Sequence, residues 1–286
     1  MTYEIARLVA PFGAEVKGLD LTRPLDTTTR QAINAAFIDN VVLVFRDQRF
    51  ATPDAFLAAA RNLGEPMPPV TATYRLPGYD VIEELVNSAT DKRTGETTPL
   101  MRGGSWHTDH SNLAAPPKAT ALYAIDLPPG GGGNTEFNSM ALAYQALSDE
   151  MKAQILGRRA FQAYLSRRAP RKLLARTEAE KQDSDGVWQP IVRRHPETGR
   201  AALYLNPMRC DAVEGLSQED GDALMDALYA HCDQKLFQYS HRWAAGDMLI
   251  WDNRAALHQA TPINVPDERR YMHRIMLKGD TPIMAD

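Results

Sequence analysis

Cysteine is scarce in this chain of 286 residues, and several other features that would point to a special environment are missing. Cys210 and Cys232 form no C-x-x-C pair, which argues against a disulfide scaffold and against a thiolate zinc site. No run of 18 apolar residues occurs, so we expect no transmembrane helix. The first residues lack a basic segment followed by an apolar one. The sequence therefore predicts a cytoplasmic protein without a signal peptide.

A strong excess of either charge is also lacking. Lys and Arg total 32, Asp and Glu total 36, and the net charge is −4. This balance gives no reason to expect a nucleic-acid or membrane partner. Hydrophobic residues make up 44% of the chain and charged residues 24%, as in ordinary globular proteins. Because neither a repeat nor a low-complexity linker interrupts the sequence, we expect one domain over residues 1–286.

The N-terminal part has an α/β pattern. Residues 28–40 carry apolar side chains on one helical face, and the apolar β-branched run 41–45 predicts a buried strand. Thr52 followed by Pro53 is typical of a helix start, and Gly64 lies where the helix that follows would end.

The rest of the chain predicts mainly strands. Short apolar or alternating runs, bounded by turn-forming residues, cover 119–127, 188–195, 201–206, 247–252 and 273–278. One further helix is indicated by a capping pattern, Ser217 with Asp220 three residues later. Many short strands with a few peripheral helices favour a mainly β fold with flanking helices (α+β), built around a barrel or jelly roll.

Residues 165–186 differ in composition from their surroundings. This segment is first rich in arginine and then acidic and polar. A charge run of this kind is typical of a solvated helix or loop. The alternative is a lid inserted over an active site.

Two histidines and one aspartate form a candidate metal site. On a regular strand, His107 and Asp109 would point to the same face, because alternate residues do. His258, which follows an apolar strand and a turn, is the candidate third ligand. Two histidines and one carboxylate make the facial triad of non-haem Fe(II) oxygenases, which leaves coordination positions open.

Two more residues support this hypothesis. Thr135 lies 26 residues after Asp109, and Arg270 lies 12 residues after His258. Both follow strand-like segments that would line the same barrel. A guanidinium binds a carboxylate through two hydrogen bonds, and a hydroxyl adds a third donor. The pair suits the distal carboxylate of a dicarboxylic cosubstrate that chelates the metal at its other end.

With these residues in place, the sequence resembles the family of Fe(II)/2-oxoglutarate-dependent dioxygenases that includes taurine dioxygenase and the 2,4-dichlorophenoxyacetate dioxygenases. The resemblance covers nearly the whole chain. It is carried by Trp106-His107-Thr108-Asp109, Gly132-Gly133-Asn134-Thr135-Glu136-Phe137, Trp251-Asp252-Asn253-Arg254, His258 and Arg269-Arg270-Tyr271-Met272-His273-Arg274.

The resemblance implies a double-stranded β-helix, a distorted jelly roll of the cupin type. It implies that His107, Asp109 and His258 bind Fe(II). Thr135 and Arg270 would hold 2-oxoglutarate, with O2 as the second cosubstrate.

It further implies that Arg274 contacts the anionic group of a small organic substrate, with Tyr74 as a second candidate contact. Hydroxylation of a C–H bond would accompany the formation of succinate and CO2. We also expect a homo-oligomer, a dimer or a tetramer.

Two alternatives stay open at this point. A metal-dependent hydrolase could use the same three ligands with zinc, although it would not need Thr135 and Arg270 at their spacings. A non-catalytic barrel would have no reason to keep open iron positions.

Overall fold

A large antiparallel-rich sheet forms the centre of the protein in the computed structural model, which describes residues 3–70, 74–90, 97–99, 103–170 and 186–286. Its strand order is β1-β2-β3-β16-β8-β18-β4, with β5 pairing along part of β18. The strands are β1 (Glu4–Arg7), β2 (Ala14–Lys17), β3 (Val42–Phe45), β4 (Pro66–Met67), β5 (Glu83–Val86), β8 (Ala119–Asp126), β16 (Met248–Asp252) and β18 (Tyr271–Leu277).

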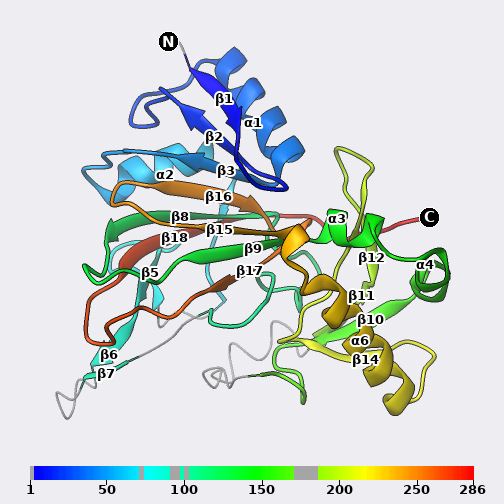
Figure 1. Ribbon diagram of the computed structural model, residues 1–286. Coiled ribbons are helices and arrows are strands. Elements are labelled where there is room, and N and C mark those ends of the chain that lie inside the picture. Colours follow the sequence, from blue (N-terminus) through cyan, green and yellow to red (C-terminus); the bar gives the residue numbers. More distant parts are fainter. Residues whose placement is uncertain (1–2, 71–73, 91–96, 100–102, 171–185) are drawn as a thin grey trace.

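A second, smaller sheet has the order β15-β9-β17. Its strands are β9 (Thr135–Ser139), β15 (Gln238–His241) and β17 (Ala256–Ala260). Phe137 from this sheet packs with Trp251 and Leu122 from the large sheet in one buried cluster. The two sheets therefore share an apolar core, as a jelly roll requires (Figure 1).

The other face of the large sheet is covered by two helices, α1 (Thr27–Asn40) and α2 (Pro53–Arg61). Phe37 and Phe56 from these helices join Ile250 and Ile275 from the sheet in a second buried cluster. Alternate residues of β8 and β18 thus serve different cores, because side chains on a strand point to opposite faces. Asp26 caps α1 and Thr52 caps α2 through their side-chain oxygens.

The remaining elements lie beside the two sheets, most of them around a third buried cluster (Figure 1). They comprise β10 (Arg159–Ala163), β11 (Gly186–Pro190), β12 (Val192–Arg194), β13 (Ala201–Leu203), β14 (Cys210–Val213), β19 (Ile283–Met284), α3 (Met140–Gln145), α4 (Asp149–Ile155), α6 (Gln218–Cys232) and the short 3-10 helix η2 (Lys235–Phe237). A two-stranded ribbon, β6 (Ser88–Thr90) with β7 (Thr97–Pro99), stands apart from these sheets.

Most of the predicted elements are confirmed. The helices at 28–40 and after Pro53 are present, and Ser217 caps α6 by accepting a hydrogen bond from the amide of Asp220 at 3.1 Å. The mainly β jelly-roll prediction is also confirmed. Within the described ranges, no helix has the length and apolar character to cross a membrane.

The single strand predicted over 188–195 is wrong. The structure divides it at Ile191 into β11, which pairs with β10, and β12, which pairs with β13 and β19. The chain changes partners at Ile191, whose amide donates to the carbonyl of Arg158 at 3.0 Å while its carbonyl accepts from the amide of Tyr204 at 2.7 Å.

The predicted lid cannot be placed in the fold. Of residues 165–186, positions 171–185 lie outside the described residues. The lid stays a prediction.

Candidate metal centre and cosubstrate site

The structure brings together His107, Asp109 and His258, although they come from distant parts of the sequence. One ligand atom from each side chain lies within 4.8 Å of the others. The Nε2 atoms of both histidines are 4.0 Å from carboxylate oxygens of Asp109. Asp109 and His258 are buried, and His107 is half-buried.

The backbone explains how the two histidines meet. His107 and His258 form an isolated antiparallel bridge, in which each amide donates to the other residue's carbonyl. The interpretation of His107 and Asp109 as neighbours on a regular strand is wrong. Asp109 lies in a turn, and His110, the next residue, has a φ of 43°. The turn, rather than strand alternation, directs the carboxylate toward the histidines.

Hydrogen bonds orient the metal-binding atoms. The Nδ1 of His107 lies 2.8 Å from the carbonyl oxygen of Ser105. Because a carbonyl only accepts, Nδ1 carries the proton and Nε2 keeps its lone pair. The ring of His258 packs between the rings of His107 and Trp251, with centroids at 4.2 and 4.6 Å.

The electrostatics of the site favour the metal-binding forms of Asp109 and His258. Burial by itself raises the pKa of Asp109, but neighbouring positive charge, chiefly that of Arg274, outweighs it and holds this pKa well below its usual range. Burial lowers the pKa of His258 well below its ordinary value, and neighbouring His107 adds to the shift. An ionised carboxylate with two neutral imidazoles is the donor set that Fe(II) takes in its facial triad. The residues present fit the metal.

Three residues that sequence reasoning did not assign to the site support Asp109. Thr120 donates from its hydroxyl to Asp109 Oδ2 at 2.6 Å. Asn253 Nδ2 donates to that same hydroxyl oxygen at 2.8 Å, and Trp251 Nε1 donates to Asn253 Oδ1 at 3.0 Å. The direction of this chain is fixed, since an indole N–H only donates. Trp251 and Asn253 carried a signal in the sequence, through their places in Trp251-Asp252-Asn253-Arg254, whereas Thr120 carried none.

Thr135 begins β9 in the smaller sheet, and Arg270 directly precedes β18 in the large sheet. Arg270 Nε donates to the carbonyl of Gly133 at 3.0 Å, and Thr135 accepts from Trp243 Nε1 at 3.0 Å. Gly133 has a φ of +64°, and a Cβ there would come within 2.8 Å of Arg270 Cδ. Burial lowers the pKa of Arg270 to about 10, and no acidic side chain in the described part of the chain pairs with it. A half-buried cation without a carboxylate partner suits an incoming carboxylate.

Arg274 reaches the metal ligands from β18. Its Nη1 donates to Asp109 Oδ1 at 3.3 Å, and its Nε donates to Glu83 Oε2 at 2.6 Å. Tyr74 lies close enough to contribute to the raised pKa of Arg274, a shift in which burial is outweighed chiefly by Glu83 and Asp109. Glu83 was missed in the sequence, where its signal is a carboxylate inside the apolar run 81–86.

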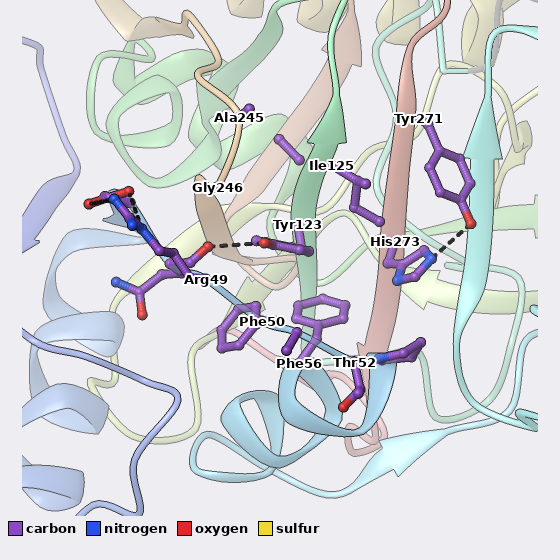
Figure 2. Close-up of a pocket in the computed structure, with 15 residues that line it drawn as sticks. Arg49, Phe50, Thr52, Phe56, Tyr123, Ile125, Ala245, Gly246, Tyr271 and His273 are labelled. Carbon is purple, nitrogen blue, oxygen red and sulfur yellow. Dashed lines mark hydrogen bonds and ion pairs between the residues drawn. The ribbon is translucent and has the colours of Figure 1, made fainter.

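His273 lies on the opposite face of β18, as alternation requires. There it lines an open hollow of about 700 Å³ with Phe50, Phe56 and Tyr123 (Figure 2). The hydroxyl of Tyr271 lies 3.0 Å from His273 Nε2. This hollow is on the side of the sheet covered by α2, away from Arg274 and Asp109.

A mainly β jelly roll with a His-Asp-His site between its sheets defines a class of metal-dependent oxygenases, and comparison with known proteins agrees. The sequence model for "Taurine catabolism dioxygenase TauD, TfdA family" matches residues 4–276. The chain belongs to this family. It is an Fe(II)- and 2-oxoglutarate-dependent dioxygenase, an oxidoreductase that uses O2 as cosubstrate, and neither a hydrolase nor a non-catalytic barrel is favoured.

Individual relatives are similar over almost their full length. An alpha-ketoglutarate-dependent 2,4-dichlorophenoxyacetate dioxygenase from Cupriavidus pinatubonensis is 30% identical, covering 95% of this chain and 96% of the relative. An alpha-ketoglutarate-dependent sulfate ester dioxygenase from Pseudomonas putida is 31% identical, covering 96% and 89%. Pentalenolactone F synthase from Streptomyces arenae is 27% identical, covering 96% and 94%.

Solved structures have the same fold. The crystal structure of AAD-2 in complex with Mn(II) and N-oxalylglycine aligns with a TM-score of 0.83 and 31% identity, covering 99% of this chain and all of the other. A taurine dioxygenase from Burkholderia xenovorans aligns with a TM-score of 0.82 and 29% identity, covering 99% and 92%.

Proposed function

We propose that this dioxygenase hydroxylates a C–H bond of a small organic substrate that carries a carboxylate, sulfonate or sulfate ester. The observation that carries the proposal is the position of Arg274, whose guanidinium contacts the metal ligand Asp109 at 3.3 Å. A cation so near the metal can hold an anionic group while a neighbouring C–H bond faces the reacting centre. Relatives named for a phenoxyacetate and for sulfate esters support this substrate class.

In this proposal His107, Asp109 and His258 hold Fe(II), and Arg270 with Thr135 holds the distal carboxylate of 2-oxoglutarate. Arg270 supplies the charge, and Thr135 has a hydroxyl proton to donate because its oxygen accepts from Trp243. When bound, iron and 2-oxoglutarate supply the oxidising chemistry, with succinate and CO2 as coproducts.

The protein's own residues bind, orient and exclude water. Arg274 and Tyr74 orient the substrate. The aromatic rings of Phe137 and Trp251, which pack around His258, keep water from that side of the site. Arg274 has a second role, since its hydrogen bond holds one carboxylate oxygen of Asp109 while Thr120 holds the other.

The test is an assay of succinate formation with Fe(II), 2-oxoglutarate and O2 over a panel of sulfonates, sulfate esters and aryloxyalkanoates. We expect one of these classes to stimulate succinate formation. The amount of hydroxylated or cleaved product should equal the amount of succinate. Stimulation only by compounds without an anionic group would contradict the substrate class. Zinc-supported hydrolysis in the absence of 2-oxoglutarate would contradict the reaction.

Four further expectations belong to this proposal. Residues 1–286 act as one catalytic unit, and residues 165–186 close over the bound substrate. The protein works in the cytoplasm as a homo-oligomer, a dimer or a tetramer. Size-exclusion chromatography with light scattering measures the assembly, and cell fractionation measures the location.

A further inference from the structure

Glu83 is a buried carboxylate beside the substrate site. Glu83 is the first residue of β5 and is 3% exposed. Its neighbour Ile82 belongs to the apolar core. The antiparallel register places Glu83 directly opposite Arg274 on β18, so both side chains point to the same face. The strand pairing itself therefore sets this contact.

The contact engages the cation that the proposed function assigns to the substrate. Glu83 Oε2 accepts from Arg274 Nε at 2.6 Å, while Arg274 Nη1 donates to Asp109 Oδ1 at 3.3 Å. Only 17% of the Arg274 side chain is exposed. Its positive charge is thus already shared by two carboxylates inside the protein.

Counting charges shows the consequence for a ligand. With the proposed roles, Arg270 balances the distal carboxylate of 2-oxoglutarate. The two positive charges of the metal balance the other carboxylate of 2-oxoglutarate and the carboxylate of Asp109. Glu83 and Arg274 then cancel each other. A monoanion placed at Arg274 would leave one negative charge without a partner in a buried site, which is unfavourable.

We propose that Glu83 determines the charge selectivity of the substrate site. By neutralising Arg274, it gives preference to substrates whose carboxylate or sulfonate is balanced by an ammonium group in the same molecule, over simple monoanions. This inference rests on the proposed function and narrows its substrate class. Glu83 acts through Arg274 and is a specificity-determining residue.

The experiment compares binding of matched probes to the wild type and to Glu83→Gln, which keeps the volume and a hydrogen-bond acceptor but removes the charge. The probe pairs share a skeleton and differ by an ammonium group: ethanesulfonate with 2-aminoethanesulfonate, hexanoate with 2-aminohexanoate, and 3-phenylpropanoate with phenylalanine. Dissociation constants are measured by calorimetry without oxygen, on protein loaded with Fe(II) and 2-oxoglutarate. We expect Glu83→Gln to bind the monoanion of at least one pair about tenfold more tightly than the wild type does. The zwitterion of that pair should gain nothing.

Glu84→Gln is the matched control. Glu84 is the next residue of β5, but it points to the other face, where it accepts from the hydroxyl of Tyr271 at 2.5 Å. The Glu84→Gln variant loses the same charge as Glu83→Gln, and its dissociation constants for the probes should stay within twofold of the wild-type values. Should Glu83→Gln fail to fold, as judged by thermal unfolding, Glu83→Met removes the charge at similar volume and carries the same expectation.

The proposal is overturned if the monoanions bind Glu83→Gln no more tightly than the wild type. It is also overturned if no probe binds to either protein. An equal gain in Glu84→Gln overturns it as well, because the effect would then be a general change in charge. These failures differ from a failure of the proposed function. If the wild type forms succinate with an anionic substrate while Glu83→Gln gains no monoanion affinity, only the role of Glu83 falls. If no anionic compound supports succinate formation, the substrate class itself is wrong.

Discussion

His107 and His258 are direct partners across an antiparallel bridge. The amide of His107 donates to the carbonyl of His258 at 3.0 Å, and the reverse bond measures 2.8 Å. The two imidazole rings are consequently held 4.2 Å apart, centroid to centroid, by the backbone. Because the backbone already fixes these two ligands, little further conformational entropy is lost when a metal binds.

The first prediction concerns the three metal ligands. His107→Ala, Asp109→Ala and His258→Ala should each abolish turnover and weaken Fe(II) binding, because a site of three ligands has none to spare. Equilibrium dialysis with Fe(II) and the succinate assay measure the two losses. His231→Ala is the control, since His231 lies on α6 and contacts the carbonyl of Ala143. Full turnover by chelator-treated, metal-free protein would contradict the site.

The second prediction concerns Thr120, which holds one oxygen of Asp109. Thr120→Val keeps the shape of the side chain but leaves Asp109 Oδ2 and Asn253 Nδ2 without this partner. We expect Fe(II) affinity to fall about 10- to 100-fold, the range for loss of a residue that orients a metal ligand. Thr120→Ser retains the hydroxyl and should restore most of the affinity. Equal affinities for the valine and serine variants would show that the hydroxyl has no orienting role.

The third prediction concerns the cosubstrate. Arg270→Gln removes the charge expected to pair with the distal carboxylate of 2-oxoglutarate. The apparent KM for 2-oxoglutarate should rise on the order of 30-fold, corresponding to ~2 kcal/mol, while the KM for the prime substrate changes little. Arg269→Gln is the control, because that neighbouring arginine is exposed and pairs with Asp126 at 3.3 Å. A rise of the same size in both variants would place the carboxylate elsewhere.

The fourth prediction concerns the buried cluster that precedes His258. Asp252 is 1% exposed and accepts from His195 Nε2 at 2.9 Å and from Arg254 Nη2 at 2.7 Å. Asp252→Asn should lower the free energy of unfolding by about 1–3 kcal/mol, because it removes one of the two carboxylates that pair with the buried guanidinium of Arg254, while Glu197 keeps its contact. Urea unfolding measures the loss, and the exposed Asp233→Asn is the control.

The same residue has a pH signature. Burial raises the pKa of Asp252, but Arg254 and His195 outweigh it, so the folded pKa lies well below the ordinary 3.8. A carboxyl with a depressed folded pKa stabilises the protein above its unfolded pKa and loses that contribution as the pH falls toward the folded value. Between pH 5 and 2.5 the stability of the wild type should therefore decline more steeply than that of Asp252→Asn. Parallel declines would show that Asp252 is not the group responsible.

Local patterns in the sequence were enough to predict several elements and the nature of the site. The caps at Thr52 and Ser217 act within three residues of the amides they accept from, so their chemistry can be read without a fold. The spacing of His107, Asp109, Thr135, His258 and Arg270 carried the resemblance to a dioxygenase family, and the family match confirms it. The roles of Thr135, Arg270, Arg274 and Tyr74 stay predictions.

Other features depend on contacts between segments far apart in the chain, and only the tertiary structure decided them. Strand alternation did not place Asp109. Its surroundings are set by the turn in which it lies and by the bridge between His107 and His258, which are far apart in the sequence. The hydrogen bond from Thr120 to Asp109 requires the turn to lie over β8. Glu83 meets Arg274 through the register of β5 on β18, which joins residues 191 positions apart. Residue types and local spacing thus determine which chemistry is available, whereas long-range strand pairing decides which charges touch, since register is set by the packing of both sheets at once.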